Sequence, residues 1–190
     1  MFDLLVLSGF LLYNYSMIYF ARHGQTDADK QNRFNGGIDL DLNEIGISQA
    51  QKQAEKLSDI KFDYVFCSPK KRAVQTCEII SKGRKFRVDE RLKELVCGIF
   101  DGKKKNVISG LRFLNAFKKG KLGVEHIENF TARNVDFCAD IVENSKDKTI
   151  LIVSHNGNVM VFDYFFKGQP KGYRFTKRIL QNGELIKFEF

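Results

Sequence analysis

The sequence has few cysteines, and their spacing lacks the commonest metal and redox motif. Four occur among 190 residues, and no two of them form a Cys-x-x-Cys pair. Zinc sites and thioredoxin-type centres commonly use that spacing, so both lose their main support. We interpret the four as reduced core residues of a cytoplasmic protein. They are Cys67, Cys77, Cys97 and Cys138.

Three other signatures are missing or incomplete. No Gly-x4-Gly-Lys-[Ser/Thr] loop occurs, so the P-loop nucleotide signature is absent. Cysteine phosphatases need Cys-x5-Arg, whereas only four residues separate Cys67 from Arg72. Asp39-Leu40-Asp41 imitates an aspartate-nucleophile motif, but Gly36-Gly37-Ile38 is a poor strand to present it. No internal repeat, low-complexity stretch or Pro/Gly/Ser-rich linker divides the chain, and its length favours one domain.

Acidic residues are outnumbered, 23 against 31 Lys and Arg, which gives a formal charge of +8. Such an excess implies a negatively charged partner without identifying it, although an adventitious basic surface is an equal alternative. We interpret Lys103-Lys104-Lys105 as a solvated loop. Nucleic-acid binding would need aromatic stacking platforms or a known motif around this charge, and neither is found. We therefore expect no nucleic-acid partner.

Basic residues are also missing from the apolar N-terminus, MFDLLVLSGFLLYNYSMIYFA. A signal peptide carries a basic n-region, whereas the early charge here is Asp3. Asp3, Asn14 and the missing basic flank argue against a membrane span, so no membrane partner is expected. We expect residues 1–16 to be a non-native or extra hydrophobic extension and residues 17–190 to be a single domain. The alternative is a native segment that packs on the domain or lies on a membrane.

Strands and helices are expected to alternate along most of the chain. Apolar runs predict strands at residues 17–21, 64–67, 87–88 and 149–154. Helical spacing and start signals predict helices from Asn43 to about Leu57, from the Ser68-Pro69 cap through Ile80, around Val135–Val142, and from Asn156 to about Phe166. This alternation predicts an α/β fold, a three-layer α/β/α sandwich with a mostly parallel central sheet.

Two segments do not fit that alternation. Residues 98–125 are rich in Gly and Lys and lack a steady period, so we expect a small excursion that covers the active face. The C-terminal RFTKRILQNGELIKFEF predicts a hairpin around Asn182-Gly183, with Ile186, Phe188 and Phe190 on one face.

Polar residues follow three of the predicted strands. They are Arg22-His23, Ser68 and Ser154-His155. Ligands of parallel α/β sheets bind beyond the carboxyl ends of the strands, so we expect these residues to meet.

A site built from these residues would suit phosphoryl transfer. A neutral imidazole such as that of His23 is a good nucleophile at neutral pH. Arginine binds two phosphate oxygens with one planar fork, so Arg22 and Arg72 are candidates to hold the phosphoryl group. A protonated His155 and the amides of the helix after it would add donors. Glu94 lies in a loop suited to supplying an acid for the leaving oxygen.

Four blocks of the sequence resemble the signatures of the histidine phosphatase superfamily, also called the phosphoglycerate mutase-like fold. They are RHGQTD, SPKKRAVQT, RLKELVCGIFDG and VSHNGN, in family order. DLDLNEIGISQAQ is similar to a further family block, and the resemblance covers nearly everything from Met17 onward.

The resemblance implies a role for each candidate residue. His23 is the nucleophile that becomes phosphohistidine, and Glu94 is the general acid and then the base. Arg22, Arg72 and His155 form the phosphate pocket. Substrate contacts are implied at Asn35, Gly36 and Asn156. No metal or cofactor is implied, and the partner is a small phosphorylated substrate.

Two positions depart from the family pattern. Asp29 stands where an asparagine is usual, and its carboxylate would repel phosphate unless protonated or turned away; Asn32 is a candidate replacement donor. Asn156 stands where glycine is usual, and asparagine tolerates left-handed backbone geometry that would keep the amide pointing inward.

The resemblance favours a phosphatase over its alternatives. Mutases carry Glu-Arg-x-Tyr-Gly after the acid, whereas Leu95-Val96-Cys97-Gly98 follows Glu94, and the chain is short for a mutase. A phosphoglycerate mutase-type transferase and a catalytically weak phospho-ligand-binding module stay open. The sequence does not indicate the oligomeric state.

Overall fold

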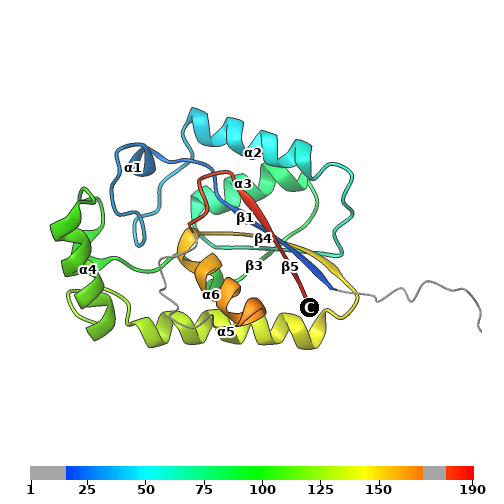
Figure 1. The fold of residues 1–190 in the computed structure, drawn as a ribbon. Helices are drawn as coiled ribbons and strands as arrows, with labels where there is room; N and C mark the ends of the chain where they lie inside the picture. The colour runs from blue at the N-terminus through cyan, green and yellow to red at the C-terminus, as the bar shows by residue number, and fades with distance from the viewer. Residues whose placement is uncertain (1–15, 169–178) are drawn as a thin grey trace, which may run out of the picture.

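A single sheet of five strands forms the centre of the molecule (Figure 1). The structure, a computed structural model, describes residues 16–168 and 179–190. The strands lie in the order β3-β2-β4-β1-β5. All neighbouring pairs are parallel except β1 and β5, which are antiparallel. The bounds are β1 Met17–Arg22, β2 Tyr64–Cys67, β3 Arg87–Val88, β4 Thr149–Ser154 and β5 Leu185–Glu189.

Helices cover both faces of this sheet, with α2 and α3 on one side and α5 and α6 on the other (Figure 1). α1 and α4 lie beyond one end of the sheet. The predicted three-layer α/β/α fold is therefore confirmed. The helices are α1 Asp27–Lys30, α2 Glu44–Lys56, α3 Lys71–Ser81, α4 Val107–Lys119, α5 Ile127–Asn144 and α6 Asn156–Lys167, with 3-10 turns at Glu90–Leu92 and Gly98–Phe100.

The central strand β4 shows why its sequence is apolar throughout. Ile150 and Ile152 pack into the core with α5 and α6, while Leu151 and Val153 pack toward α3. All four side chains are fully buried. A parallel strand covered on both faces needs apolar residues at successive positions, and each buried aliphatic side chain contributes about 2 kcal/mol.

Strand register brings the three polar strand ends together. Arg22 at the end of β1 is paired with Ser154 at the end of β4, and Cys67 at the end of β2 is paired with Val153. The next residues along the chain, His23, Ser68 and His155, therefore emerge at one edge of the sheet.

The predicted start of α3 at Ser68-Pro69 is wrong. The helix begins at Lys71, and its N-cap residue Lys70 makes no side-chain capping hydrogen bond. The Ser68 hydroxyl accepts from Lys70 N at 3.3 Å, just before the helix, and also lies 2.7 Å from His155 Nε2. The sequence does not display this second, long-range contact.

The C-terminal strand pairs differently from the predicted hairpin. β5 pairs with β1, from Met17 opposite Glu189 to Ala21 opposite Leu185. The turn at 182–183 is present, and residues 179–180 before it form no strand. The rest of the expected first arm, residues 174–178, lies outside the described residues. The predicted apolar face of residues 186, 188 and 190 is confirmed, since all three pack into the core.

The excursion at residues 98–125 contains a helix that the prediction lacked. Asn106 and Ser109 form a capping box that begins α4. Phe113 and Phe117 then pack α4 onto the domain, where Phe113 contacts the ring of Phe34 with centroids 4.9 Å apart. The following helix, α5, begins at residue 127 rather than near residue 135.

Most of the predicted N-terminal extension, residues 1–15, lies outside the described residues. Ser16 is buried and joined to the domain. Its backbone exchanges hydrogen bonds with Phe190, and its hydroxyl donates to Ser145 O at 3.0 Å. Within the described ranges, no helix is both long and apolar enough to cross a membrane.

Candidate active site

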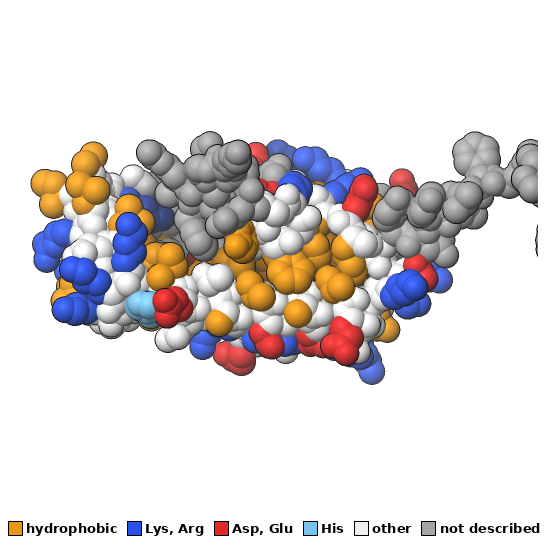
Figure 2. Space-filling view, turned by 60° about the horizontal axis from the view of Figure 1, so that its bottom comes forward, with side chains coloured by type: hydrophobic (Ala, Val, Ile, Leu, Met, Phe, Trp, Pro, Cys, Tyr) orange, Lys and Arg blue, Asp and Glu red, His pale blue; other side chains and the backbone are white. Residues whose placement is uncertain are grey.

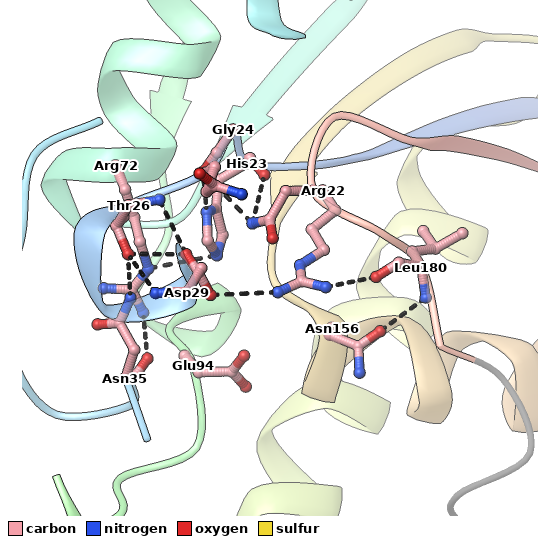
Figure 3. Close-up of polar contacts among 12 residues, drawn as sticks. Arg22, His23, Gly24, Thr26, Asp29, Asn35, Arg72, Glu94, Asn156 and Leu180 are labelled. Carbon is pink, nitrogen blue, oxygen red and sulfur yellow. Dashed lines mark hydrogen bonds and ion pairs between the residues drawn. The ribbon is translucent and has the colours of Figure 1, made fainter. Parts of the chain in front are cut away.

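The predicted convergence of His23, Arg72 and His155 is present in the structure, and Figure 3 shows Arg72 beside His23. The two imidazole rings lie edge to face, with centroids 5.0 Å apart. Arg72, from the first turn of α3, donates from Nε to His23 Nε2 at 3.3 Å. Three segments far apart in sequence therefore meet at His23.

A cavity of about 410 Å³ opens beside this cluster. Six predicted site residues line it: Arg22, His23, Asn35, Gly36, Glu94 and Asn156. Arg72 and His155 are fully buried behind the cavity wall, where both contact His23 and Arg72 also bonds to the cavity-lining Asn35. The sequence analysis missed further lining residues, among them Phe34, Lys105, Phe113 and Gly157.

His23 is held in one tautomer by its own backbone neighbour. Its Nδ1 lies 2.7 Å from Gly24 O. A carbonyl oxygen only accepts, so Nδ1 carries the proton and Nε2 carries the lone pair. Burial, followed by the cations of Arg72 and Arg22, holds the pKa of His23 well below its usual range. The ring is therefore neutral at pH 7.

Glycine at position 24 is required by a close backbone approach. A Cβ there would lie 2.3 Å from Gly46 O, at the start of α2. The Gly24 amide also donates to Thr76 Oγ1 on α3 at 3.1 Å. This packing holds the Gly24 carbonyl that orients His23, which explains why a glycine follows the histidine.

Arg72 supports the cavity wall as well as His23. Its guanidinium donates from Nη1 to Ile38 O and from Nη2 to Asn35 O, both at 3.0 Å. These bonds attach residues 35–38, and with them the cavity-lining Asn35 and Gly36, to α3.

His155 is neutral, whereas the sequence analysis expected a protonated ring. Burial is the largest cause that lowers its pKa well below the usual range, and the cation of Arg72 adds to it. His155 is therefore neutral in this structure. Its Nε2 contacts Ser68 Oγ, so Ser68 is a site residue rather than a helix cap. The polar strand-end pattern singled out Ser68 correctly.

Asp29 is ionised and turned toward its own loop. Its Oδ2 accepts from Thr26 N at 3.0 Å and from Thr26 Oγ1 at 2.7 Å. Burial alone would raise the pKa of Asp29, but the neighbouring His23, the Thr26 hydrogen bonds and the Arg22 cation together outweigh it, so the pKa is lowered. Arg22 pairs with Asp29 Oδ1 at 3.4 Å and donates to Leu180 O. Asp29 therefore occupies part of the Arg22 fork.

Asn32 does not replace the missing donor in this structure. It lines the cavity, but its Nδ2 donates to Lys105 O at 3.3 Å. The backbone N–H of Lys105 in turn donates to the backbone carbonyl of Asn32 at 2.8 Å. This pair fixes Lys105 at the cavity wall.

Glu94 faces the cavity across from His23 (Figure 3). Its Oε1 accepts from Leu95 N at 2.9 Å, and its Oε2 from Gly157 N at 3.5 Å. A Cβ on residue 157 would lie 2.3 Å from Glu94 Oε1, so a side chain there would displace this carboxylate from its position.

Asn156 does not use the expected left-handed backbone. It has no positive φ and is the first residue of α6. Its Oδ1 accepts from Leu180 N at 2.8 Å, which joins the helix start to the C-terminal segment.

Several buried polar atoms of the site have no hydrogen-bond partner. Five such side-chain atoms occur among the described residues, and three belong to predicted site residues: Arg22 Nε, Asn35 Oδ1 and His155 Nδ1. Leaving a buried polar atom unpaired costs about 1–3 kcal/mol. Two of the three, Arg22 Nε and Asn35 Oδ1, belong to cavity-lining residues, so a polar ligand bound there would give them partners.

Comparisons with known proteins agree with this geometry. A Schizosaccharomyces pombe protein named as a probable phosphatase is 30% identical over 173 residues, which cover 87% of this chain and 79% of that protein. Arabidopsis thaliana phosphoglycerate mutase-like protein 4 is 31% identical over 86% of this chain and 76% of that protein. The crystal structure of the α-ribazole phosphatase from Shigella flexneri has the same fold, with a TM-score of 0.78 at 24% identity over 90% and 89% of the two chains.

The family profile matches almost the whole described chain. The histidine phosphatase superfamily (branch 1) matches residues 18–190. This match and the relatives above confirm the predicted family and its phosphatase-type enzyme class. The chain belongs to branch 1 of the histidine phosphatase superfamily.

Proposed function

We propose that this protein hydrolyses small phosphomonoesters through a phosphohistidine formed on Nε2 of His23. The observation that carries the proposal is the neutral ring of His23, whose proton is held on Nδ1 by Gly24 O. This ring lines the same cavity as Glu94. The lone pair that attacks phosphorus lies on Nε2, where it accepts the Arg72 Nε hydrogen bond, and as the bond to phosphorus forms this N–H turns to a phosphoryl oxygen.

The first half-reaction transfers the phosphoryl group to the enzyme. The Nε2 lone pair forms a bond to phosphorus as the bond from phosphorus to the ester oxygen breaks. The protonated Glu94 carboxyl gives its proton to that oxygen, and the alcohol leaves. His23 then carries the phosphoryl group, and Glu94 is a carboxylate.

The second half-reaction returns the enzyme to its starting state. The Glu94 carboxylate takes a proton from water as the water oxygen bonds to phosphorus. The bond from Nε2 to phosphorus breaks, and its electron pair returns to the ring. The products over one cycle are one alcohol and one inorganic phosphate.

Charge on the transferring phosphoryl oxygens is met by donors around His23. Three N–H groups of Arg72 are used by His23, Asn35 and Ile38, so further N–H groups of this side chain can reach phosphate oxygens. Arg22 exchanges its Asp29 contact for the phosphate. A bound dianion favours the protonated form of His155, which turns a neutral ring into a cation when the substrate arrives.

The cavity walls favour a small anionic substrate. Arg22 and Lys105 line the cavity, and Phe34 and Phe113 add apolar surface next to them. Hydrolysis is favoured over mutase chemistry because the residue directly after Glu94 is Leu95. Leucine has no positive charge that could hold the carboxylate of a mutase substrate. We propose the cytoplasm as the location of this activity.

Turnover of p-nitrophenyl phosphate tests this function. Wild type should release nitrophenol at mildly acidic pH, and a chelator should not change the rate. His23→Ala should lose at least about 10³-fold in rate. The matched control is His126→Ala, which removes a histidine at the start of α5 that does not line the cavity.

Two outcomes would contradict the proposal. Retained turnover in His23→Ala would exclude His23 as the nucleophile. Absence of turnover across phosphorylated metabolites, together with retained binding, would favour the phospho-ligand-binding module.

A further inference from the structure

Almost all of the net positive charge lies in one short segment around α4. Residues 102–124 contain seven Lys and Arg and no Asp or Glu, so this segment carries +7 of the chain's +8. The remaining residues carry 24 basic and 23 acidic side chains, which is nearly neutral. We call residues 102–124 the α4 basic segment. Its cations are Lys103, Lys104, Lys105, Arg112, Lys118, Lys119 and Lys121.

The same segment exposes large aliphatic side chains. Val107, Ile108 and Leu111 are 77%, 72% and 64% exposed, and Leu114 is 42% exposed. Positions 107, 111 and 114 follow one another at helical spacing, with 108 beside them, so the four share one side of α4. Isolated exposed apolar residues are common, but four on one side of a 13-residue helix form a patch.

This patch points away from the domain. α4 packs inward through a different set of positions, and Phe113, Ala116 and Phe117 lie in the core cluster. On a helical wheel, Lys118 falls within the exposed apolar side, and Arg112 and Lys119 lie at its border. Figure 2 shows hydrophobic and Lys/Arg side chains side by side at the end of the molecule that holds α4.

We propose that the α4 basic segment binds the surface of an anionic lipid bilayer. The helix would lie in the membrane plane, with its aliphatic side chains among the acyl chains near the headgroups. Its lysines would contact the lipid phosphates. An exposed apolar stripe bordered by cations is the pattern of helices that lie in a membrane interface.

Charge and shape favour this occupant over others. A second copy of the chain would bring another +7 segment against the first, and like charges repel. α4 lies beyond one end of the sheet (Figure 1), and its exposed aliphatic side chains lie on the side of the helix that faces away from the core. The expectation of no membrane partner rested on Asp3, Asn14 and the missing basic flank of the N-terminus, and it did not consider residues 102–124.

The proposed surface also borders the candidate active site. Lys105 and Phe113 belong to the α4 basic segment and line the cavity. A bilayer bound by the outer side of α4 would therefore lie next to the cavity wall. The proposal itself does not depend on the proposed catalytic activity.

Vesicle co-sedimentation of the full chain tests it. One set of vesicles contains phosphatidylcholine alone, and the other an equimolar mixture with phosphatidylserine. We expect binding to the mixed vesicles, weak or no binding to the neutral ones, and loss of binding as salt is raised.

Substitutions on α4 assign the binding to this helix. Each lysine near an anionic surface contributes about a fivefold factor, so Lys118→Gln with Lys119→Gln should weaken binding about 25-fold. Ile108→Asp with Leu111→Asp should weaken it more than about tenfold. The matched controls on α2, Lys52→Gln with Lys56→Gln and Ile45→Asp, should bind as wild type does. Circular dichroism checks that each variant is folded.

Residues 1–15 are identical in all these variants, so their own affinity for lipid cannot produce a difference. Equal binding of wild type and folded α4 variants would overturn the proposal. So would equal binding to neutral and anionic vesicles. Failure to bind vesicles, together with salt-sensitive binding to an acidic polypeptide such as polyglutamate, would assign the surface to an acidic protein partner instead.

Discussion

The reactive ring of His23 is oriented by a backbone carbonyl instead of a carboxylate. Gly24 O accepts the Nδ1 proton at 2.7 Å, and this arrangement adds no negative charge behind the ring. Burial and the neighbouring guanidinium groups then favour the neutral ring. In the proposed mechanism this keeps the His23 lone pair on the nitrogen that attacks the phosphoryl group.

Asp29 places a negative charge beside Arg22, one of the cations proposed to bind phosphate oxygens. Asp29→Asn removes a carboxylate that pairs with Arg22 at 3.4 Å, so Arg22 gains freedom to bind phosphate. We expect kcat/KM for p-nitrophenyl phosphate to rise roughly tenfold near pH 7, corresponding to about 1.4 kcal/mol. Asp27→Asn, in the same short helix but outside the cavity, is the control. A lower kcat/KM in a folded Asp29→Asn variant would show that Asp29 assists catalysis.

Glu94 should matter most when the leaving group needs a proton. In Glu94→Gln we expect a loss of about 10²–10⁴-fold for an alkyl phosphate and a much smaller loss for p-nitrophenyl phosphate. Initial rates with both esters on wild type and variant measure the difference. Equal losses for the two esters would contradict the role of Glu94 as general acid.

Among the helices and strands, α3 supplies a residue of the candidate active site in addition to packing against the sheet. Its first turn supplies Arg72, which contacts His23 and also holds the loop at residues 35–38 through two backbone carbonyls. α6 contributes the close contact between Gly157 and Glu94. The two helices lie on opposite faces of the sheet, so the site depends on both outer layers of the fold (Figure 1).

Replacing Arg72 with lysine tests this dependence on α3. Arg72→Lys keeps the charge but lacks the planar fork that reaches His23, Asn35 and Ile38 together. We expect kcat/KM to fall about 10²-fold without loss of the fold, as followed by circular dichroism. Lys71→Ala, one residue earlier, should retain activity. Near wild-type activity in Arg72→Lys would show that charge alone is sufficient.

The sequence predicts those elements whose burial requires a regular pattern of apolar residues. It predicts less well the features that depend on contacts between residues far apart in the chain. TILIVS at residues 149–154 and the strand ends at His23 and His155 were correctly interpreted, because a doubly covered strand must be apolar and its polar end is conspicuous. α4 was missed because apolar residues occur on both its buried and its exposed sides. Ser68 was correctly placed among the strand-end residues, but its contact with His155 was not foreseen, because the two residues are 87 positions apart.

For the whole molecule, two fully buried histidines make stability depend on pH. The pKa values of His23 and His155 are both held well below the usual value of 6.5 in the folded protein. In the unfolded chain both rings take up protons as the pH falls through that value, whereas the folded chain binds fewer. The folded state is therefore destabilised as pH decreases below it.

Urea unfolding at neutral pH and at about pH 5.5 measures this effect. We expect the free energy of unfolding to fall by about 1 kcal/mol for each of the two histidines over this range. A folded variant with His23→Gln and His155→Gln should show a flatter pH dependence, and His126→Gln should not change it. An unchanged free energy of unfolding in wild type would contradict the buried neutral state of both rings.

The most direct test of the proposed chemistry is to trap the phosphorylated enzyme. Wild type is mixed with substrate, quenched within a fraction of a turnover in alkali, which preserves phosphohistidine, and digested for mass spectrometry. The account predicts one added phosphoryl group on the peptide that contains His23, bonded to Nε2 and absent from His23→Gln. A phosphoryl group on another residue, or rapid turnover with no phosphorylated enzyme at any quench time, would contradict it.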